Sequence, residues 1–317
     1  MTLSGCGIYS PVNWKKSSDH KPVWIDVPIV INYNELVITN PNATSEFGGS
    51  NPKELVSYNG IECLLKMSSS RDVATNEVLA SKLYQLAGIK VPNLTLVVNS
   101  EQSPNKWYVL SELAEDYVDA LMKDKQARGV ENESEQKLLL EKRDKIIESY
   151  KSGHLRKELH FGYMTDVWLS NWDVMGTDKS SIDGKPLFAN IGISNGEIIR
   201  IDVGGSLAYR AQGGLKPTQL FNAVPIEDFH DKFRAEQPSQ LYNDLGKSSG
   251  RRDFGTCIGL QNLLHIQPNQ ITQTIGLYKD YMSSELFKRL SDVVVQRLEW
   301  CKTNFVTFQK ECNTLSS

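Results

Sequence analysis

The sequence predicts an α+β fold of two lobes, a small β-rich N-terminal lobe with one helix and a larger helical C-terminal lobe. Strand patterns with turn signals fill the first third of the chain, interrupted by a single helical pattern. Beyond residue 114 most periodic segments are helical. We therefore predict a flexible arm over residues 1–22, an N-terminal lobe over 23–113 and a C-terminal lobe over 114–317.

Composition excludes several classes of protein. The chain has 317 residues, of which 40% are hydrophobic and 23% charged, with a net charge of −3. This length supports a sizeable core, and the slight acidity argues against nucleic acid as a partner. No apolar run approaches the roughly 20 residues of a membrane span, and no signal-peptide pattern opens the chain. Five scattered cysteines indicate reduced thiols, so we expect a cytoplasmic protein as folded, with secretion into a host cytosol as the alternative.

The N-terminal lobe is predicted as a meander of five strands with one inserted helix. An edge strand over 23–30 is also suggested, because Pro28 is poorly tolerated in a central strand. A turn-rich loop with Gly48, Gly49 and Ser50 separates the first two strands of the meander, and such a loop can bring backbone N–H groups to phosphates. Asn59-Gly60 predicts a hairpin. The remaining predicted elements are a short strand over 35–39, hairpin strands within 54–67, a helix over 72–87, and strands over 93–99 and 106–113.

A lysine and a glutamate of this lobe are predicted to pair. Alternation on the third strand directs Lys66 away from the apolar face, near the end of the strand. On the helix, Glu77 lies in the same row as Val73, Ala80 and Tyr84, and a carboxylate in an apolar row needs a partner. Lys66 is the nearest candidate. The alternative is that Glu77 lies at a solvated rim and Lys66 extends along apolar surface to water.

The C-terminal lobe is organised around residues 166–205, which hold four side-chain oxygen donors: Asp173, Asp178, Asn190 and Asp202. Asn195-Gly196 between apolar segments predicts a hairpin. A three-residue loop would place Asn190 and Asp202 on one face, about 7–8 Å apart, where they could share a hard cation. A two-residue loop would place them on opposite faces. The predicted helices of this lobe cover residues 135–150, 225–233, 238–245, 268–282 and 284–305.

An upstream acid, then an asparagine, then an aspartate before Gly-Gly is typical of kinase-like phosphotransferase sites. In such sites one aspartate handles the acceptor hydroxyl, while the asparagine and second aspartate hold Mg²⁺ on the phosphates. The alternative is an acid-rich hairpin with solvated carboxylates.

Three segments together resemble the HipA-like and phosphoinositide-kinase-like branch of the kinase superfamily, most closely the atypical kinases among bacterial secreted effectors. They are NEVLASKLYQLAGIKVP, DVWLSNWDVMG and RIDVGGSLAYRAQGG. The resemblance covers about residues 46–215. It implies a phosphate loop at Gly48, Gly49 and Ser50, nucleotide contacts from Lys66 oriented by Glu77 and from Glu112 and Leu113 at the hinge, a catalytic Asp173, and metal ligands Asn190 and Asp202.

One departure from this pattern leaves the assignment open. Sixteen residues separate Asp173 from Asn190, where kinase catalytic loops have about four. An insertion over 178–187 must loop out. Otherwise Asp178 or Asp183 would take the place of Asp173 or Asn190.

The resemblance implies an ATP-dependent phosphotransferase that uses Mg²⁺ or Mn²⁺ and acts on an unknown protein acceptor. An atypical protein Ser/Thr kinase acting as a bacterial effector is the first expectation. The alternatives are a phosphoinositide or small-molecule kinase, an AMP transferase on the same fold, and a nucleotide-binding pseudokinase that serves as an interaction module.

A cluster of cations precedes the central stretch. Solvated surface charge is the default explanation for such a run. The alternative is a site for a polyanionic activator such as an inositol polyphosphate, since clustered Arg and Lys suit multiple phosphates. The candidate residues for this site are Lys151, His154, Arg156, Lys157, His160, Lys216, Arg251 and Arg252.

Overall fold

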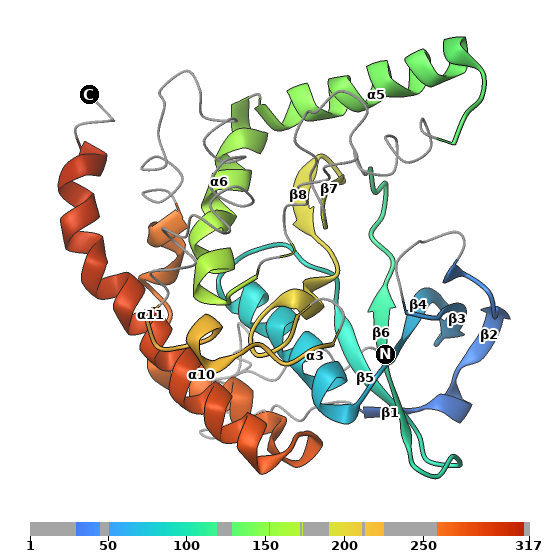
Figure 1. Cartoon of the computed structure of the whole chain (residues 1–317), viewed down its shortest axis with the longest axis horizontal. Coiled ribbons are helices and arrows are strands. Elements are labelled where there is room, and N and C mark those ends of the chain that lie inside the picture. Colours follow the sequence, from blue (N-terminus) through green and yellow to red (C-terminus); the bar gives the residue numbers. More distant parts are fainter. Residues whose placement is uncertain are drawn as a thin grey trace, which may run out of the picture.

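The computed structural model describes residues 30–44, 51–118, 129–151, 153–171, 173, 190–210, 213–224 and 259–313. A six-stranded sheet occupies the N-terminal part, and helices make up most of the rest (Figure 1). The predicted α+β class is confirmed. The predicted divisions of the chain at residues 22 and 113 remain predictions, although the sheet does end with Glu112.

The sheet differs in strand order from the predicted meander. Its strands are β1 (Val30–Asn32), β2 (Val37–Asn40), β3 (Lys53–Tyr58), β4 (Ile61–Ser68), β5 (Leu94–Asn99) and β6 (Lys106–Glu112), in the order β1-β5-β6-β4-β3-β2. The meander prediction was wrong here, because β6 lies between β4 and β5. The chain leaves β4 through a helix, forms β5 one position further out, and returns to fill the gap. Strand β1 then joins the far edge, parallel to β5; the rest of the predicted 23–30 strand lies outside the described residues.

The β3–β4 hairpin forms as predicted. Tyr58 pairs with Ile61 across the two-residue turn, and Asn59 and Gly60 have φ angles of 53° and 79°. Positive φ at both central residues is the type I′ geometry that favours Asn-Gly. This register places Lys53 of β3 directly opposite Lys66 of β4.

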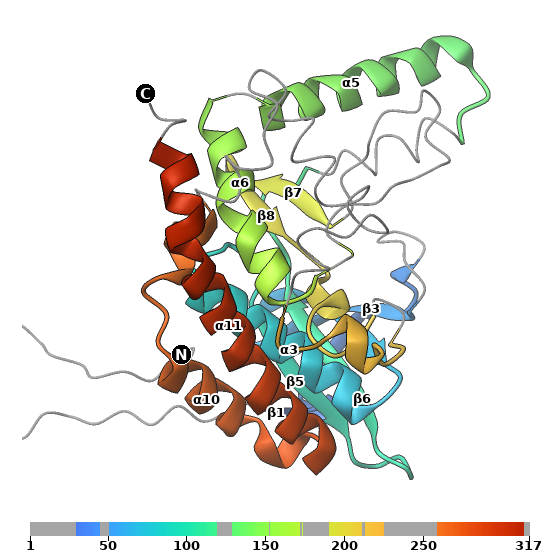
Figure 2. The same ribbon diagram turned by 60° about the vertical axis from the view of Figure 1, so that its left-hand side comes forward.

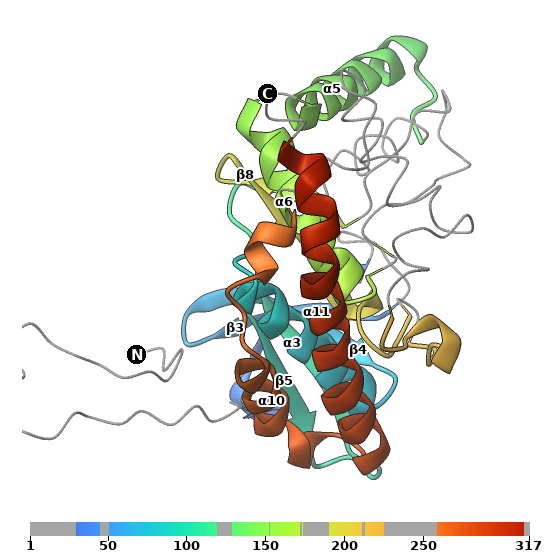
Figure 3. The same ribbon diagram turned by 90° about the vertical axis from the view of Figure 1, so that its left-hand side faces the viewer.

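Helix α3 (Arg71–Leu86) connects β4 to β5 and lies against the sheet. The Ser70 side chain caps its first turn by accepting from the Val73 N–H. Gly88, with a φ of 72°, ends it as predicted. Figures 2 and 3 show α3 between the sheet and the C-terminal helices α10 (Pro268–Leu277) and α11 (Ser284–Asn313).

The remaining helices and a second hairpin complete the described structure. Helix α5 (Glu133–Lys151) projects from the body and leads to α6 (Gly153–Trp168), which packs against α11 (Figure 1). Strands β7 (Ile191–Ser194) and β8 (Glu197–Arg200) form the second hairpin. The predicted helices over 225–233 and 238–245 lie outside the described residues. None of the described helices is both long and apolar enough to cross a membrane.

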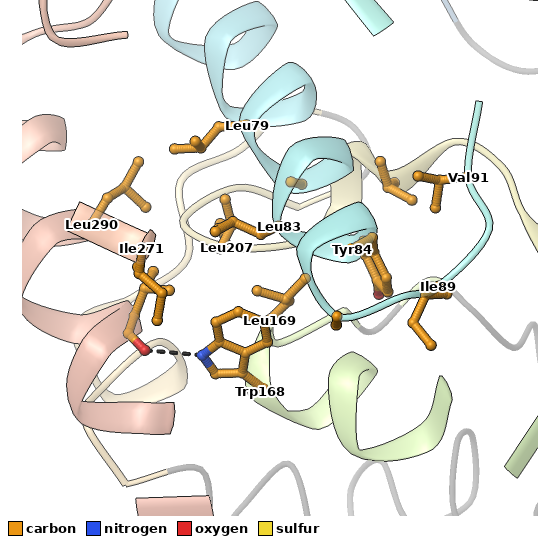
Figure 4. Close-up of a cluster of buried hydrophobic side chains, with 14 of the residues drawn as sticks. Leu79, Leu83, Tyr84, Ile89, Val91, Trp168, Leu169, Leu207, Ile271 and Leu290 are labelled. Atoms are coloured by element: carbon orange, nitrogen blue, oxygen red, sulfur yellow. Dashed lines mark hydrogen bonds between the residues drawn. The ribbon is translucent and has the colours of Figure 1, made fainter. Parts of the chain in front are cut away.

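One hydrophobic core spans the sheet-facing helix and the C-terminal helices. Leu79 and Leu83 of α3 lie close to Trp168, which ends α6, and to Ile271 and Leu290 of α10 and α11 (Figure 4). The Trp168 indole donates to the backbone carbonyl of Val294, 2.9 Å away. A smaller apolar cluster, with Val56, Leu65 and Tyr108, is separate from this core.

Candidate active site

Lys66 lies between two carboxylates that come from distant parts of the chain. Its ammonium nitrogen is 2.5 Å from Glu77 Oε1 and 2.7 Å from Asp202 Oδ1. Burial lowers the pKa of Lys66, but the two carboxylates outweigh burial and leave that pKa above its ordinary value. Lys66 is therefore a fixed positive charge at physiological pH, and the structure places it beside Glu77 as the sequence predicts.

The two carboxylates compete for this one ammonium with different results. Burial raises the pKa of Glu77 more than Lys66 lowers it. For Asp202 the attraction of Lys66 outweighs burial, and the pKa lies below its ordinary value. The Asp202 side chain is 46% exposed, against 5% for Glu77. Asp202 is thus the ionised carboxylate that a ligand can contact, whereas Glu77 is buried and holds Lys66 in place.

Gly204 lets the loop after Asp202 approach Glu77 closely. A Cβ at Gly204 would lie 2.9 Å from Glu77 Oε2. Any larger residue would therefore displace the carboxylate that holds Lys66. Asn76, the residue before Glu77, binds the same loop by donating to Ser206 O and accepting from Ala208 N.

Lys53 is a second cation at this site, which the sequence analysis did not single out. Directly opposite residues of an antiparallel pair project from the same face, so Lys53 and Lys66 share a face of the sheet. Lys53 is only 8% exposed, and its charge lowers the pKa of both Glu77 and Asp202. The signal was available, because the two-residue turn at Asn59-Gly60 fixes which residue lies opposite Lys66.

The turn that ends helix α6 positions Asp173 at the candidate site. Ser170 has a φ of 53°, and the Ser170 and Asn171 N–H groups donate back to Val167 O and Asp166 O. This is a Schellman ending, with serine where glycine is usual. It reverses the chain so that the Asn171 side chain accepts from the Asp173 N–H at 3.1 Å.

Asn190 holds Asp173 from the other side. Its amide Nδ2 donates to the backbone O of Asp173 at 2.8 Å and to Oδ2 at 2.9 Å. The predicted catalytic acid and the first predicted metal ligand are therefore in contact, despite the long segment between them. Asp178 and Asp183, the alternatives for these roles, lie outside the described residues.

Asp173 has a pKa suited to proton transfer near neutral pH. Burial and the nearby Asp202 carboxylate raise the pKa of Asp173 to about 6, and the hydrogen bond from Asn190 offsets only part of this rise. A base with a pKa near the working pH is the most effective general base.

The second hairpin has the shorter of the two loops that the sequence left open. Ser194 pairs with Glu197, so the loop contains two residues, Asn195 and Gly196. Alternation would then separate Asn190 from Asp202, but both residues lie just beyond the paired strands. They adopt left-handed φ angles of 60° and 48°, a conformation that Asn and Asp tolerate better than most residues. Backbone turns at the strand ends therefore set the directions of these two side chains, in place of alternation.

The donor set fits a hard divalent cation held jointly with phosphates. Asn190 uses Nδ2 toward Asp173, which leaves its Oδ1 directed away from that acid. Asp202 offers an ionised, partly exposed carboxylate. Within the described ranges, no three His, Cys, Asp or Glu side chains form a metal cage. One or two protein oxygens completed by phosphates and water is the usual coordination of protein-bound Mg²⁺.

Comparison with known proteins identifies the fold. No protein-family model and no curated protein matches the sequence. Among solved structures, the proinflammatory kinase CtkA of Helicobacter pylori is similar over 88% of this chain and 99% of its own, with 16% identity and a TM-score of 0.50.

The chain has an atypical protein-kinase-like fold. The expected likeness to HipA-like atypical kinases is thus confirmed at the level of fold. HipA of Shewanella oneidensis aligns over 91% of this chain and 76% of its own, at 10% identity and a TM-score of 0.43. The PAN3 pseudokinase of Drosophila melanogaster aligns over 88% of this chain and 67% of its own, at 10% identity and a TM-score of 0.28.

The predicted hinge connects directly to the hairpin that lies between the two predicted metal ligands, Asn190 and Asp202. Glu112 ends β6, and its carboxylate accepts from the Asn93 side chain at 2.9 Å. Five residues beyond Leu113, Val118 exchanges two backbone hydrogen bonds with Ile193 of β7. The segment that follows the predicted nucleotide contacts Glu112 and Leu113 is therefore hydrogen-bonded to the strand that follows Asn190.

Several predicted site residues, or their side chains, lie outside the described part of the chain. The phosphate loop, Gly48 to Ser50, lies outside the described residues. So do Arg251 and Arg252 of the predicted polyanion site, together with the side chains of Lys151, His154, Arg156 and His160. Lys157 is exposed on α6. The polyanion site stays a prediction for these residues.

Lys216 must be removed from that predicted surface. It is 1% exposed, and its ammonium donates to the backbone carbonyls of Ser170 and Gly205. Ser170 lies three residues before Asp173, and Gly205 lies three residues after Asp202. The Lys216 ammonium therefore connects two loops of the candidate site, and it is too buried to bind a ligand at the surface.

Proposed function

We propose that this protein is an ATP-dependent phosphotransferase that uses Mg²⁺ or Mn²⁺. The observation that carries the proposal is Lys66 held between Glu77 and Asp202, with Asp173 held by Asn190 beside them. A pseudokinase has no need to keep both the contacts of Lys66 with Glu77 and Asp202 and the contact of Asp173 with Asn190. This arrangement therefore favours catalysis over a role as an interaction module.

Each side chain has a distinct role in the proposed reaction. Lys66 and Lys53 neutralise phosphate oxygens, and Glu77 fixes Lys66 in place. Asp202 and the Oδ1 of Asn190 would hold the cation, which offsets charge on the transferred phosphoryl group. Asp173 accepts the proton of the acceptor hydroxyl, and its pKa of about 6 leaves it ionised at neutral pH. Catalysis would rest on positioning and charge neutralisation.

We further propose a protein Ser/Thr side chain as the acceptor and a bacterial effector as the biological setting. The support is the fold shared with CtkA, a kinase described as proinflammatory. The same site geometry would serve a lipid or small-molecule acceptor, or transfer of AMP. The identity of the labelled product separates these cases.

The test incubates the purified protein with MgCl₂ or MnCl₂ and with ATP labelled at either the γ- or the α-phosphate, alone and with a host-cell lysate. Label from the γ-phosphate on protein is expected. Label from the α-phosphate on protein would show AMP transfer instead, and γ-label on lipid would show a lipid kinase. Asp202→Ala should abolish transfer, while Asp292→Asn, an exposed acid on α11, should not. A folded, ATP-binding protein that labels nothing would overturn the proposal in favour of a pseudokinase.

A further inference from the structure

Tyr84 lies two helical turns after Glu77 on the same row of α3, and its hydroxyl is buried. Residues seven apart on a helix face the same side. Glu77 reaches Lys66 on the sheet. The Tyr84 hydroxyl instead reaches the far end of the site, where α6 leads into the catalytic loop (Figure 4 shows the Tyr84 ring beside that end).

A directed series of hydrogen bonds runs from Asp173 through Tyr84 to a buried acid. The Asp173 N–H donates to Asn171 Oδ1 at 3.1 Å, and Asn171 Nδ2 donates to the Tyr84 hydroxyl at 3.0 Å. That hydroxyl donates to Asp166 Oδ1 at 2.7 Å. The direction of the three hydrogen bonds is fixed by the two ends of the series, because the Asp173 N–H can only donate and the Asp166 carboxylate can only accept. The series therefore fixes which way the Asn171 amide points.

The acid at the end of this series is itself held firmly. Arg200 binds Asp166 through Nε at 2.7 Å and Nη2 at 2.8 Å, a two-point contact in which both side chains are 2% exposed. Gly162 leaves room for the guanidinium, since a Cβ there would overlap it. Arg200 ends β8, two residues before Asp202. Asp166 thus connects to Asp173 through Tyr84 and to Asp202 through β8.

We propose that the Tyr84 hydroxyl is a positioning group for Asp173, so that α3 fixes both ends of the site. Glu77 fixes the position of the Lys66 ammonium. Tyr84 orients the Asn171 amide, which in turn fixes the position of the Asp173 backbone N–H. Without the hydroxyl, Asn171 loses the partner that fixes its amide, and the Asp173 N–H loses an oriented acceptor. The inference rests on the proposed phosphotransfer for its kinetic consequence, but the positional consequence can be measured without turnover.

The experiment compares Tyr84→Phe with Tyr108→Phe. Both changes remove one hydroxyl from a buried ring, but Tyr108 belongs to the smaller apolar cluster. Tyr84→Phe should lower kcat about 10-fold while KM for ATP changes less than about 2-fold, because misplacing a reacting group affects the transition state more than nucleotide binding. Amide hydrogen exchange at Asn171 and Asp173 should accelerate in Tyr84→Phe alone. Tyr108→Phe should match the wild type in all three measurements.

A double-mutant cycle tests whether the hydroxyl acts through Asn171. Adding Tyr84→Phe to Asn171→Ala should cause little further loss of kcat, since the connection is already broken. Additive losses would mean that Tyr84 acts on stability alone and would overturn the inference, as would unchanged exchange at Asp173 in Tyr84→Phe. If the wild type transfers no phosphoryl group, the proposed function fails, and the exchange measurement alone decides the role of Tyr84.

Discussion

At the scale of single residues, we predict that Asp173 makes the proposed activity dependent on pH. The pKa of Asp173 is raised to about 6 by burial and by Asp202. A raised pKa means that the carboxyl is protonated at pH 5 and ionised above pH 7, and only the ionised form accepts a proton. We expect kcat/KM for ATP, which reports the free enzyme, to rise as the pH increases through about 6.

Asp173→Asn is the control for this profile. It should remove most of the activity. The activity that remains should show no rise in kcat/KM near pH 6. A wild-type profile that stays flat down to pH 5 would contradict the role of Asp173 as the base. The fold of both proteins should be checked by circular dichroism at each pH.

Lys53 is expected to share the phosphate-binding role of Lys66. The charge of Lys53 lowers the pKa of Glu77 and of Asp202, the two carboxylates that contact Lys66, and bound ATP would add further negative charge beside it. We predict that Lys53→Met raises KM for ATP about 10-fold or more, since a hydrogen bond to a charged group contributes about 1.5–3 kcal/mol. Steady-state kinetics with Lys106→Met, an exposed lysine of the same sheet, provides the control. An unchanged KM in Lys53→Met would assign Lys53 a structural role.

How far the site could be predicted depends on whether a residue carries a local signal. Glu77 stood out because a carboxylate interrupted an apolar helical row, and Lys66 was the nearest strand lysine. Asp166 gave no such signal, because its partners Tyr84 and Arg200 are distant in sequence. Lys216 was misread as a surface cation, since nothing local indicates that its ammonium binds backbone carbonyls.

At the scale of elements, two segments of the chain hold helix α3: residues 281–283 and the loop after Asp202. Asp72, in its first turn, accepts from the Ser283 N–H at 2.8 Å and from the Ser283 hydroxyl at 2.5 Å. The Thr75 hydroxyl donates to Tyr281 O, and Asn76 binds the loop after Asp202. Ser283 in turn caps α11 by accepting from Leu286 N. The position of Glu77 therefore depends on the C-terminal helices.

We predict that Asp72→Ala loosens this attachment and raises KM for ATP, because Glu77 is then less firmly placed against Lys66. The loss of the hydrogen bonds from Ser283 should also cost about 1.5–3 kcal/mol of stability, the typical value for hydrogen bonds to a charged group. Glu285→Ala is the matched control: it removes a carboxylate from the same end of α11 that forms no described bond to α3. Equal kinetics for both variants would show that α3 is held without Asp72.

Turn chemistry made some elements predictable and left others ambiguous. Asn59-Gly60 and Asn195-Gly196 both form the hairpins that their sequences indicate. The sequence left the loop length of the second open between two and three residues, because nothing local shows whether Ser194 pairs with Glu197. The sheet order was missed for another reason: local patterns indicate strands, but the pairing of β6 between β4 and β5 is a long-range choice.

At the scale of the whole molecule, the sheet and the C-terminal helices share one core. The division into two lobes was predictable from the change in periodicity along the chain. The continuity of the core was not, because the contact of α3 with α10 and α11 joins segments about 200 residues apart and leaves no local pattern. The two parts should therefore unfold together.

Leu290→Ala tests this shared core. Leu290 is fully buried on α11 and lies in the same cluster as Leu79 and Leu83 of α3. Truncating a buried leucine costs about 2–5 kcal/mol through lost burial and the cavity left behind. Because one core serves both parts, hydrogen exchange in β6 should report the same loss of opening free energy as exchange in α11. Lys288→Ala, at an exposed position of the same helix, should leave both unchanged. Faster exchange in α11 with β6 unaffected would show instead that the sheet is stable without the C-terminal helices, and that Glu77 is held by the sheet alone.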